Sequence, residues 1–320
     1  MDKIPSTIVK LLKKQKYHLV GHHSAIKKCR WTHNSLVFNR VCYKEKFYGV
    51  KSHRCLQITP SIIWCSHTCN FCWRIQPKDI NINWNQTKIS VPLDSPKEIL
   101  DGCIREWRRI LSGYKPTSHE KVDWIKWEEA NQPFSVAISL SGEPTLYPYL
   151  SDLISECKKR NLISFLVSNG TFPEILKDIE EPNQLYISLI SANKKLYKEI
   201  CRPLISDSWE RLNKAFALIP SFNCPTVFRL TLMHGMNLKN PEEFAKIINK
   251  ASPMYVECKG YMYLGFSRGR GLELDHMPRH EEIKLFSEKI ADLTGYKILD
   301  ESLKSRVVLL SRLDKPKRFS

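Results

Sequence analysis

The chain has 320 residues, of which 42% are hydrophobic and only 12 are glycine, so it is neither fibrous nor flexible and fits one large domain or two ordinary ones. Its net charge of +17 favours a polyanionic partner such as nucleic acid, with an ordinary solvated basic face as the alternative. Because neither a bilayer-crossing run nor a signal peptide is recognisable, we expect a cytoplasmic protein whose eleven cysteines are metal ligands or buried thiols.

The first 54 residues differ in composition from the rest of the chain. Residues 1–60 contain 13 lysines and arginines but only two acidic residues, Asp2 and Glu45, which gives this segment +11 of the net charge. No basic helix with a wide apolar face is recognisable, so binding to a polyanion is favoured over attachment to a membrane. We predict that residues 1–54 are an extension folded against the mouth of the following domain, residues 55–320.

From residue 55 onward, apolar strand-like runs alternate with helical patterns, which predicts βα units and a parallel sheet. The expected strands are residues 56–64, 134–140, 163–167, 185–190, 227–233 and 254–257. The expected helices are residues 95–113, which begin with a capping box, and residues 149–160, 208–218, 241–250 and 280–294. This order predicts an incomplete (β/α)6 barrel with its chemistry at the carboxyl ends of the strands. Residues 76–132 form a long insertion, whose tryptophans we expect in its own core unless one stacks on a base.

The run Cys65-Ser66-His67-Thr68-Cys69-Asn70-Phe71-Cys72 directly follows the first expected strand. Its three thiols, at offsets of four and three, can hold three irons of a cubane cluster, and a nearby fourth thiol is missing. The fourth iron would then be open to another ligand. The alternatives are a three-cysteine zinc knuckle completed by a histidine, and three buried thiols that act as small hydrophobic residues.

The C-x3-C-x2-C spacing of this run resembles the signature of the radical S-adenosylmethionine (SAM) superfamily. The resemblance implies that the open iron chelates SAM and that one electron then breaks its sulfonium bond, leaving a 5′-deoxyadenosyl radical. Glu143, in Ser-Gly-Glu-Pro-Thr at residues 141–145, matches a Gly-Gly-Glu-Pro motif that receives the SAM amino group, with Ser141 in place of the first glycine. Asn169 and Ser188, near the ends of the next two strands, are expected to bond ribose hydroxyls.

Three further cysteines, Cys29, Cys42 and Cys55, lie 13 residues apart and precede the main run. By themselves they are compatible with a structural zinc site that uses one of three histidines (His23, His33 or His53), or with unconnected thiols. The remaining cysteines are expected to be buried small residues: Cys103, Cys157, Cys201, Cys224 and Cys258.

The combination of this triplet with C-x3-C-N-F-C-W-R and with Ser-Leu-Ser-Gly-Glu-Pro-Thr-Leu-Tyr-Pro at residues 139–148 resembles one family, the archaeal tRNA 4-demethylwyosine synthases of wybutosine biosynthesis. The resemblance runs from about residue 20 to residue 310. It implies a radical SAM carbon–carbon lyase that condenses N1-methylguanosine, at the 3′ side of the tRNA anticodon, with pyruvate. It also implies two [4Fe-4S] clusters, one held by Cys65, Cys69 and Cys72 and the other held by Cys29, Cys42 and Cys55.

The resemblance further implies that pyruvate binds either the open iron of the second cluster or a nearby lysine as a Schiff base. Lys44, two residues after Cys42, is our candidate, because a cationic neighbourhood lowers the pKa of a lysine and frees its amine to attack a carbonyl. A phosphate-binding or solvated role is the alternative, and Lys259 is a second candidate. No flavodoxin-like segment is recognisable, so we expect an external electron donor, and we expect a monomer.

The basic segments are then expected to bind phosphates around the anticodon loop, with strong salt dependence. The candidates are Lys27, Lys28 and Arg30 beside Cys29, Arg268 and Arg270 in the glycine-rich run 265–271, and a further group of Lys13, Lys14 and Lys16. Two other functions remain as alternatives. A radical SAM activator of glycyl-radical enzymes would not need the N-terminal triplet, and a non-catalytic, metal-stabilised RNA-binding protein would not need Glu143 or Asn169.

Overall fold

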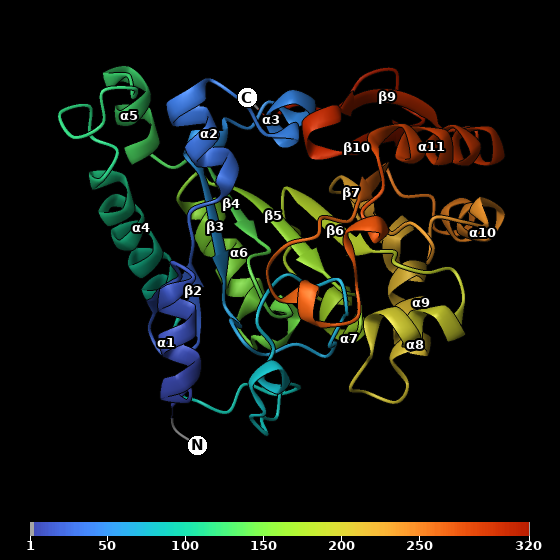
Figure 1. Ribbon diagram of the computed structural model, residues 1–320, viewed down its shortest axis with the longest axis horizontal. Helices are drawn as coiled ribbons and strands as arrows, with labels where there is room; N and C mark the ends of the chain where they lie inside the picture. The colour runs from blue at the N-terminus through green and yellow to red at the C-terminus, as the bar shows by residue number, and fades with distance from the viewer. Residues whose placement is uncertain (1–2, 320) are drawn as a thin grey trace. The chain divides into compact units, whose positions relative to one another are not determined.

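The computed structural model describes residues 3–319 (Figure 1). These residues fall into two compact units. The first unit contains residues 3–64, 88–166 and 317–319, and the second contains residues 65–87 and 167–316. The basic extension 1–54 is therefore grouped with the first strands of the expected barrel. The expected insertion 76–132 is divided between the units after residue 87. The boundaries between the compact units therefore differ from the boundary after residue 54 that composition predicted.

The described strands of the first unit lie in the order β1-β2-β3-β4-β5. They are β1 (His18–Val20), β2 (Ser24–Ile26), β3 (Cys55–Thr59), β4 (Ser135–Ile138) and β5 (Ile163–Ser168), the last two residues of which belong to the second unit. The pairs β1–β2 and β2–β3 are antiparallel, whereas β3–β4 and β4–β5 are parallel. Leu56, Ile58, Val136 and Ile138 are fully buried, which explains why the parallel strands read as apolar runs in the sequence.

The helices described in the first unit include one whose capping box was predicted. They are α1 (Ser6–Lys14), α2 (Arg30–Phe38), α3 (Tyr43–Tyr48), α4 (Pro96–Ser112), α5 (Trp124–Asn131) and α6 (Leu150–Lys159). The hydroxyl of Ser95 accepts from the Glu98 N–H, and the Glu98 carboxylate accepts from the Ser95 N–H at 2.8 Å, so the prediction for α4 is confirmed. This helix packs against β1, β2 and β3 (Figure 1). Its Trp107 is fully buried and donates to the carbonyl of Ala130 at 2.7 Å, whereas Trp124 is 47% exposed.

The described strands of the second unit, after the end of β5, lie in the order β6-β7-β8-β10-β9. They are β6 (Gln184–Ser188), β7 (Thr226–Leu232), β8 (Tyr255–Gly260), β9 (Lys297–Ser302) and β10 (Val307–Ser311). The strands β6, β7 and β8 are parallel, and β10 lies antiparallel between β8 and β9. The helices are α7 (Pro173–Lys177), α8 (Lys194–Cys201), α9 (Ser208–Leu218), α10 (Pro241–Ala251) and α11 (His280–Thr294). Helices α10 and α11 pack together, and α11 also packs against β8, β9 and β10 (Figure 1).

All six predicted parallel strands, β3 to β8, are present, and their alternation with helices is typical of a partial β/α barrel. The predictions for α9 and α11 are correct to the residue. The first strand is shorter than predicted, because it ends at Thr59 before Pro60 instead of at residue 64. In the described part of the chain, no helix combines the length and the apolar character that crossing a membrane requires.

Candidate active site

The run from Cys65 to Cys72 forms a loop whose three cysteine residues are half-buried and not in disulfides. The loop is anchored on the end of α8, where the N–H of Thr68 donates to the carbonyls of Cys201 and Arg202 at 3.2 and 3.1 Å. Three free thiols on one anchored loop are the donor set that a cubane cluster with one open iron requires. The residues present therefore fit the cluster that the sequence analysis expected.

Cys69 lies beside two residues that the sequence analysis did not connect with it. The donor atoms of Cys69, Cys201 and His67 lie within 4.8 Å of one another. A hydrogen bond with Cys201, together with burial, raises the pKa of the Cys69 thiol. Burial lowers the pKa of His67 to about 3, so its ring is neutral at physiological pH, and it bonds the hydroxyl of Tyr197 at 2.6 Å. Cys201 is buried, as expected, but it also contacts a predicted cluster ligand.

Asn169 follows β5 and lies against the same loop. Its Nδ2 donates to the hydroxyl of Ser66 at 2.8 Å and lies 3.8 Å from the Sγ of Cys65, while its Oδ1 accepts from the hydroxyl of Thr171 at 2.7 Å. Ser188, the last residue of β6, is partly exposed and pairs with Arg229 of β7. Of the two predicted ribose contacts, Asn169 is thus the one that the structure joins to the cysteine loop.

Glu143 follows β4 in the first unit and lies next to Trp64, the residue immediately before Cys65. The N–H of Glu143 donates to the carbonyl of Trp64 at 2.8 Å. This approach requires Gly142, which has a φ of +68° and whose added Cβ would lie 1.7 Å from the carbonyl oxygen of Ser61. The Glu143 carboxylate is buried and accepts from the hydroxyl of Thr145 at 2.7 Å. The β4 turn is therefore built tightly against the backbone that leads into the cysteine loop.

The three N-terminal cysteines are brought together at the other end of β3. Cys29 and Cys42 cap the starts of α2 and α3, and Cys55 is the first residue of β3. Burial and the charge of neighbouring thiols raise the pKa of Cys42 to about 12, and burial likewise raises the pKa values of Cys29 and Cys55. The charge of Lys44 acts in the opposite direction on all three pKa values, so Lys44 belongs to this cluster of thiols.

This thiol group lies at the amino end of a strand, where the rule for barrel enzymes does not place chemistry. β3 spans five residues, so its ends are roughly 13 Å apart at about 3.3 Å per residue. Cys55 stands at its amino end, whereas Glu143 follows the carboxyl end of the adjacent parallel strand β4. The first unit therefore carries candidate residues at both ends of its parallel strands.

Two of the histidines considered as zinc ligands are already engaged through both ring nitrogens. His23 bonds the carbonyl of Pro60 through Nδ1 at 2.5 Å and the N–H of Asp94 through Nε2 at 2.9 Å. His53 bonds the hydroxyl of Ser35 through Nδ1 at 3.1 Å and the carboxylate of Glu129 through Nε2 at 2.7 Å. These contacts weigh against a structural zinc site built from the cysteine triplet and either histidine.

The two lysine candidates for pyruvate lie in different surroundings. The Nζ of Lys44 lies 4.1 Å from the centre of the Phe165 ring, on β5, in addition to its place beside the three thiols. Lys259, on β8, donates to the carbonyl of Ser305 at 2.6 Å. Of the two lysine candidates, Lys44 is therefore the one that lies beside predicted cluster ligands.

The predicted tRNA contacts divide into exposed and engaged side chains. Arg30 and Arg268 are exposed, and Arg268 bonds the carbonyl of Tyr263 at 3.2 Å. Lys27 lies 4.5 Å from the ring centre of Tyr17, and Lys28 bonds the hydroxyl of Tyr114. Burial lowers the pKa of Lys28.

Arg270 has to be withdrawn from the predicted phosphate contacts. Its side chain is only 3% exposed and forms an ion pair with Asp79 at 2.5 Å. Its remaining donors bond backbone carbonyls of the segment that begins with the cysteine loop. A buried guanidinium with its donors occupied cannot also bind a phosphate, and composition reveals its charge but not its burial.

Sequence reasoning missed a polar cluster on the second unit's sheet. Arg229 of β7 pairs laterally with Ser188 of β6 and Glu257 of β8, so these three side chains share one face of the sheet. Arg229 forms an ion pair with the buried Glu257, which also accepts from the hydroxyl of Tyr186 at 3.2 Å. The sequence did carry a signal for this cluster, because Arg229 and Glu257 are charged residues within two runs that otherwise read as apolar strands.

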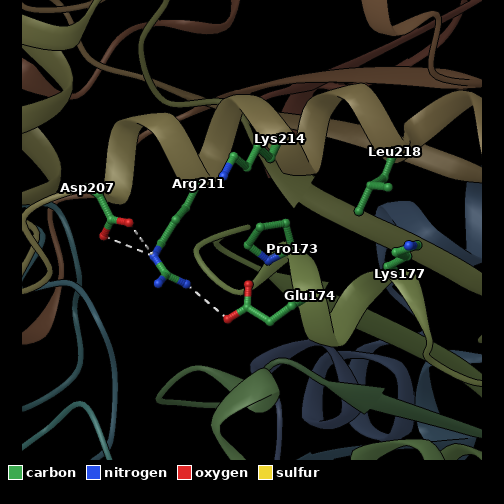
Figure 2. A pocket seen from close by; sticks show the side chains of 7 residues that line it. All are labelled: Pro173, Glu174, Lys177, Asp207, Arg211, Lys214 and Leu218. Atoms are coloured by element: carbon green, nitrogen blue, oxygen red, sulfur yellow. Dashed lines mark hydrogen bonds and ion pairs between the residues drawn. The ribbon is translucent and has the colours of Figure 1, made fainter.

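A pocket of about 370 Å³ is lined mainly by residues of α7 and α9 (Figure 2). Its lining residues are Pro173, Glu174, Lys177, Asp207, Arg211, Lys214 and Leu218. Arg211 bridges the carboxylates of Glu174 and Asp207 at 2.9 and 3.0 Å (Figure 2). Exposed ion pairs of this kind are common on solvated surfaces, and no residue predicted to be functional lines the pocket.

Comparisons with known proteins agree with these features. The radical SAM superfamily model matches residues 59–248, and the model for wyosine base formation matches residues 250–312. The S-adenosyl-L-methionine-dependent tRNA 4-demethylwyosine synthase of Pyrococcus horikoshii is 45% identical over 97% of this chain and 90% of its own length. That of Methanocaldococcus jannaschii is 38% identical over 96% of both chains. The human synthase TYW1 is 34% identical over 94% of this chain and 40% of its own length.

Solved structures show the same relationship. A structure of TYW1 with a lysine-pyruvate adduct bound has a TM-score of 0.87 at 35% identity and covers 98% of this chain and 99% of that chain. The crystal structure of archaeal TYW1 has a TM-score of 0.81 at 32% identity and covers 99% of this chain and all of the other. The chain therefore has the radical SAM fold and belongs to the family of S-adenosyl-L-methionine-dependent tRNA 4-demethylwyosine synthases.

Proposed function

We propose that this chain is the lyase that forms 4-demethylwyosine in tRNA from N1-methylguanosine, at the 3′ side of the anticodon, and pyruvate. The observation that carries the proposal is the grouping of Lys44 with Cys29, Cys42 and Cys55, in a chain that also carries the radical SAM cysteine loop. The lysine-pyruvate adduct described for a TYW1 relative supports the same assignment.

The residues divide the chemistry between two sites. A [4Fe-4S] cluster on Cys65, Cys69 and Cys72, together with SAM, would supply the 5′-deoxyadenosyl radical that takes a hydrogen atom from the N1-methyl group. Glu143 is proposed to bind the amino group of SAM, and Asn169 or Ser188 its ribose. An external donor supplies the electron.

The second site is proposed to hold pyruvate. The amine of Lys44 condenses with the keto group of pyruvate, losing water, and the imine fixes this small anion until the carbon radical on the base adds to the imine carbon. The bond from that carbon to the carboxyl carbon then breaks, and the carboxyl group leaves as carbon dioxide and one electron, or as formate when the external donor supplies one more electron with a proton. The exocyclic amino group of the base then attacks the imine carbon, which closes the third ring and releases the amine of Lys44. The neighbouring Cys29, Cys42 and Cys55 are proposed to hold a second [4Fe-4S] cluster.

The decisive test is an anaerobic turnover assay with N1-methylguanosine-containing tRNA, SAM and pyruvate, read by nucleoside mass spectrometry. We expect a product with the mass of 4-demethylwyosine that depends on all three substrates. Release of 5′-deoxyadenosine without any change in the tRNA would contradict the proposed substrates while leaving the radical SAM assignment intact.

Iron content tests the second cluster separately. The reconstituted chain is expected to bind about eight irons, and a variant with Cys29, Cys42 and Cys55 replaced by alanine about four, because each cubane holds four. The matched variant with Cys65, Cys69 and Cys72 replaced should also bind about four. Four irons in the parent chain, unchanged by the N-terminal replacements, would show that the triplet holds no cluster.

The protein is proposed to be a cytoplasmic monomer that binds tRNA through exposed basic residues, among them Arg30 and Arg268. Arg268→Glu is expected to weaken tRNA binding about tenfold and to lower the salt slope by about one, because it removes one phosphate contact. Lys246→Glu, an exposed change on α10, is the control for net charge. Equal weakening by both variants would show that only the overall charge matters. SAM cleavage should be unchanged in both.

A further inference from the structure

A buried arginine from the segment after β8 reaches the cysteine loop within the second unit. Arg270 directly follows the short helical turn Gly265–Gly269, and its side chain is 3% exposed. Asp79, its ionic partner, lies seven residues after Cys72, and its side chain is 10% exposed. Nearly 200 residues of sequence therefore separate this guanidinium from the loop that it contacts.

The guanidinium donates in two directions at once. Its Nε and Nη2 bind the two carboxylate oxygens of Asp79 at 2.8 and 2.5 Å, a bidentate pair. Its Nη1 donates to the carbonyls of Cys69, at 3.3 Å, and Cys72. Its Nη2 also donates to the carbonyl of Arg74 at 2.6 Å. One planar group thus joins the backbone at two predicted cluster ligands to a fixed carboxylate.

A second, independent contact joins the segment that contains Arg270 to the backbone directly after Cys72. The N–H of Phe266 donates to the carbonyl of Trp73 at 3.0 Å. Gly265 has a φ of +57°, and an added Cβ would lie 2.3 Å from that same carbonyl oxygen. Gln76 completes the arrangement, because its side chain donates to the carbonyl of Cys69 at 3.1 Å and its N–H to Asp79 at 2.7 Å.

We propose that Arg270 is a positioning residue for the SAM cluster, which fixes the backbone path from Cys69 to Cys72. A buried ion pair by itself adds little to stability compared with apolar residues of similar size. Stability alone therefore does not explain why the donors converge on carbonyls of the cysteine loop. Only a guanidinium offers the planar fork that serves a carboxylate and several carbonyls together, so lysine cannot replace it.

The inference rests on the proposed radical SAM function, but it concerns the cluster alone. The reported match to wyosine base formation, residues 250–312, includes Arg270, whereas the cysteine loop lies in the match to the superfamily. The segment that distinguishes this family would thus hold the cluster loop that the whole superfamily shares.

The test compares Arg270→Lys with Lys78→Gln, a charge change at the exposed residue next to Asp79. In Arg270→Lys we expect the reduced cluster to lose iron to a chelator roughly tenfold faster, as for other residues that orient metal ligands. We also expect an altered electron paramagnetic resonance spectrum of the SAM-bound cluster. Lys78→Gln should match the parent in both measurements and in melting temperature. Arg270→Lys is expected to lower the melting temperature of the cluster-free chain, because it leaves buried acceptors unpaired, so iron loss is compared well below both unfolding transitions.

A second variant keeps the proposal testable if Arg270→Lys does not fold. Asp79→Asn keeps an acceptor oxygen but releases the guanidinium from its bidentate partner, so an intermediate rate of iron loss and a smaller spectral change are expected. Parent-like iron loss and spectra in every variant that folds would overturn the positioning role. Because neither tRNA nor pyruvate is used, this result is distinct from failure of the proposed reaction.

Discussion

Replacing Lys44 with arginine is expected to lower formation of the tricyclic nucleoside by at least about 10³-fold, because an arginine side chain stays protonated and cannot attack a carbonyl. The positive charge beside Cys29, Cys42 and Cys55 is kept, so the second cluster should assemble normally. SAM cleavage, which does not need this amine, should persist in the absence of pyruvate. The measurement is anaerobic turnover by nucleoside mass spectrometry together with release of 5′-deoxyadenosine.

Borohydride trapping with labelled pyruvate identifies the amine directly. The parent chain is expected to carry the label at Lys44, and the Lys44→Arg variant to carry none. Lys46→Arg, on the exposed side of the same short helix α3, is the matched control and should behave as the parent. Label at Lys259, or full activity without label at any residue, would contradict the Schiff base and favour binding of pyruvate at the second cluster.

The two proposed sites explain why the first unit carries residues at both ends of its parallel strands. The thiols and Lys44 lie at the amino end of β3, and Glu143 lies after the carboxyl end of β4. Within this unit, the residue proposed to bind SAM and the residues proposed to hold pyruvate therefore lie at opposite ends of the parallel strands.

Local signals were sufficient to predict much of the fold. The start of α4 was predicted because Ser95 and Glu98 satisfy each other's N–H groups, a property of four consecutive residues. The bounds of α9 and α11 were also correct, and Gly295, in the left-handed conformation, marks the end of α11. The first strand was predicted too long, because residues 60–64 are buried without being a strand. The N–H of Ile62 there donates to the carbonyl of His23, a contact that no local pattern reveals.

The candidate site was predicted in part for a similar reason. The spacing of Cys65, Cys69 and Cys72 is short enough for one loop to present all three thiols, so the pattern alone indicates a cluster. Cys29, Cys42 and Cys55 depend on two helix starts and a strand start to bring them together, and their spacing alone left zinc open. Arg270 was misassigned because neighbouring glycines predict a loop, but they do not predict which side of the loop is buried.

The second large effect concerns Gly142, whose replacement by alanine is expected to lower the free energy of unfolding by about 3 kcal/mol or more. The added Cβ would lie 1.7 Å from the carbonyl oxygen of Ser61 and 2.5 Å from that of Trp64. Both are backbone atoms, so no side-chain rotation relieves the clash. The β4 turn must then move away from Ser61 and Trp64, which displaces Glu143 and breaks its hydrogen bond to the carbonyl of Trp64, directly before the cysteine loop. Loss of iron from the SAM cluster should accompany the loss of stability.

Gly235→Ala separates the clash from the backbone conformation. Gly235 has a φ of +73°, close to that of Gly142, but an added Cβ there would meet nothing within 4 Å. Its replacement should therefore cost only the left-handed conformation, about 1–2 kcal/mol, and leave the iron content unchanged. The measurement is denaturant unfolding of both variants beside the parent. Equal costs would mean that the φ value alone demands glycine at position 142, whereas a larger cost for Gly142→Ala with loss of iron would assign the difference to the close packing of the β4 turn on the backbone before Cys65.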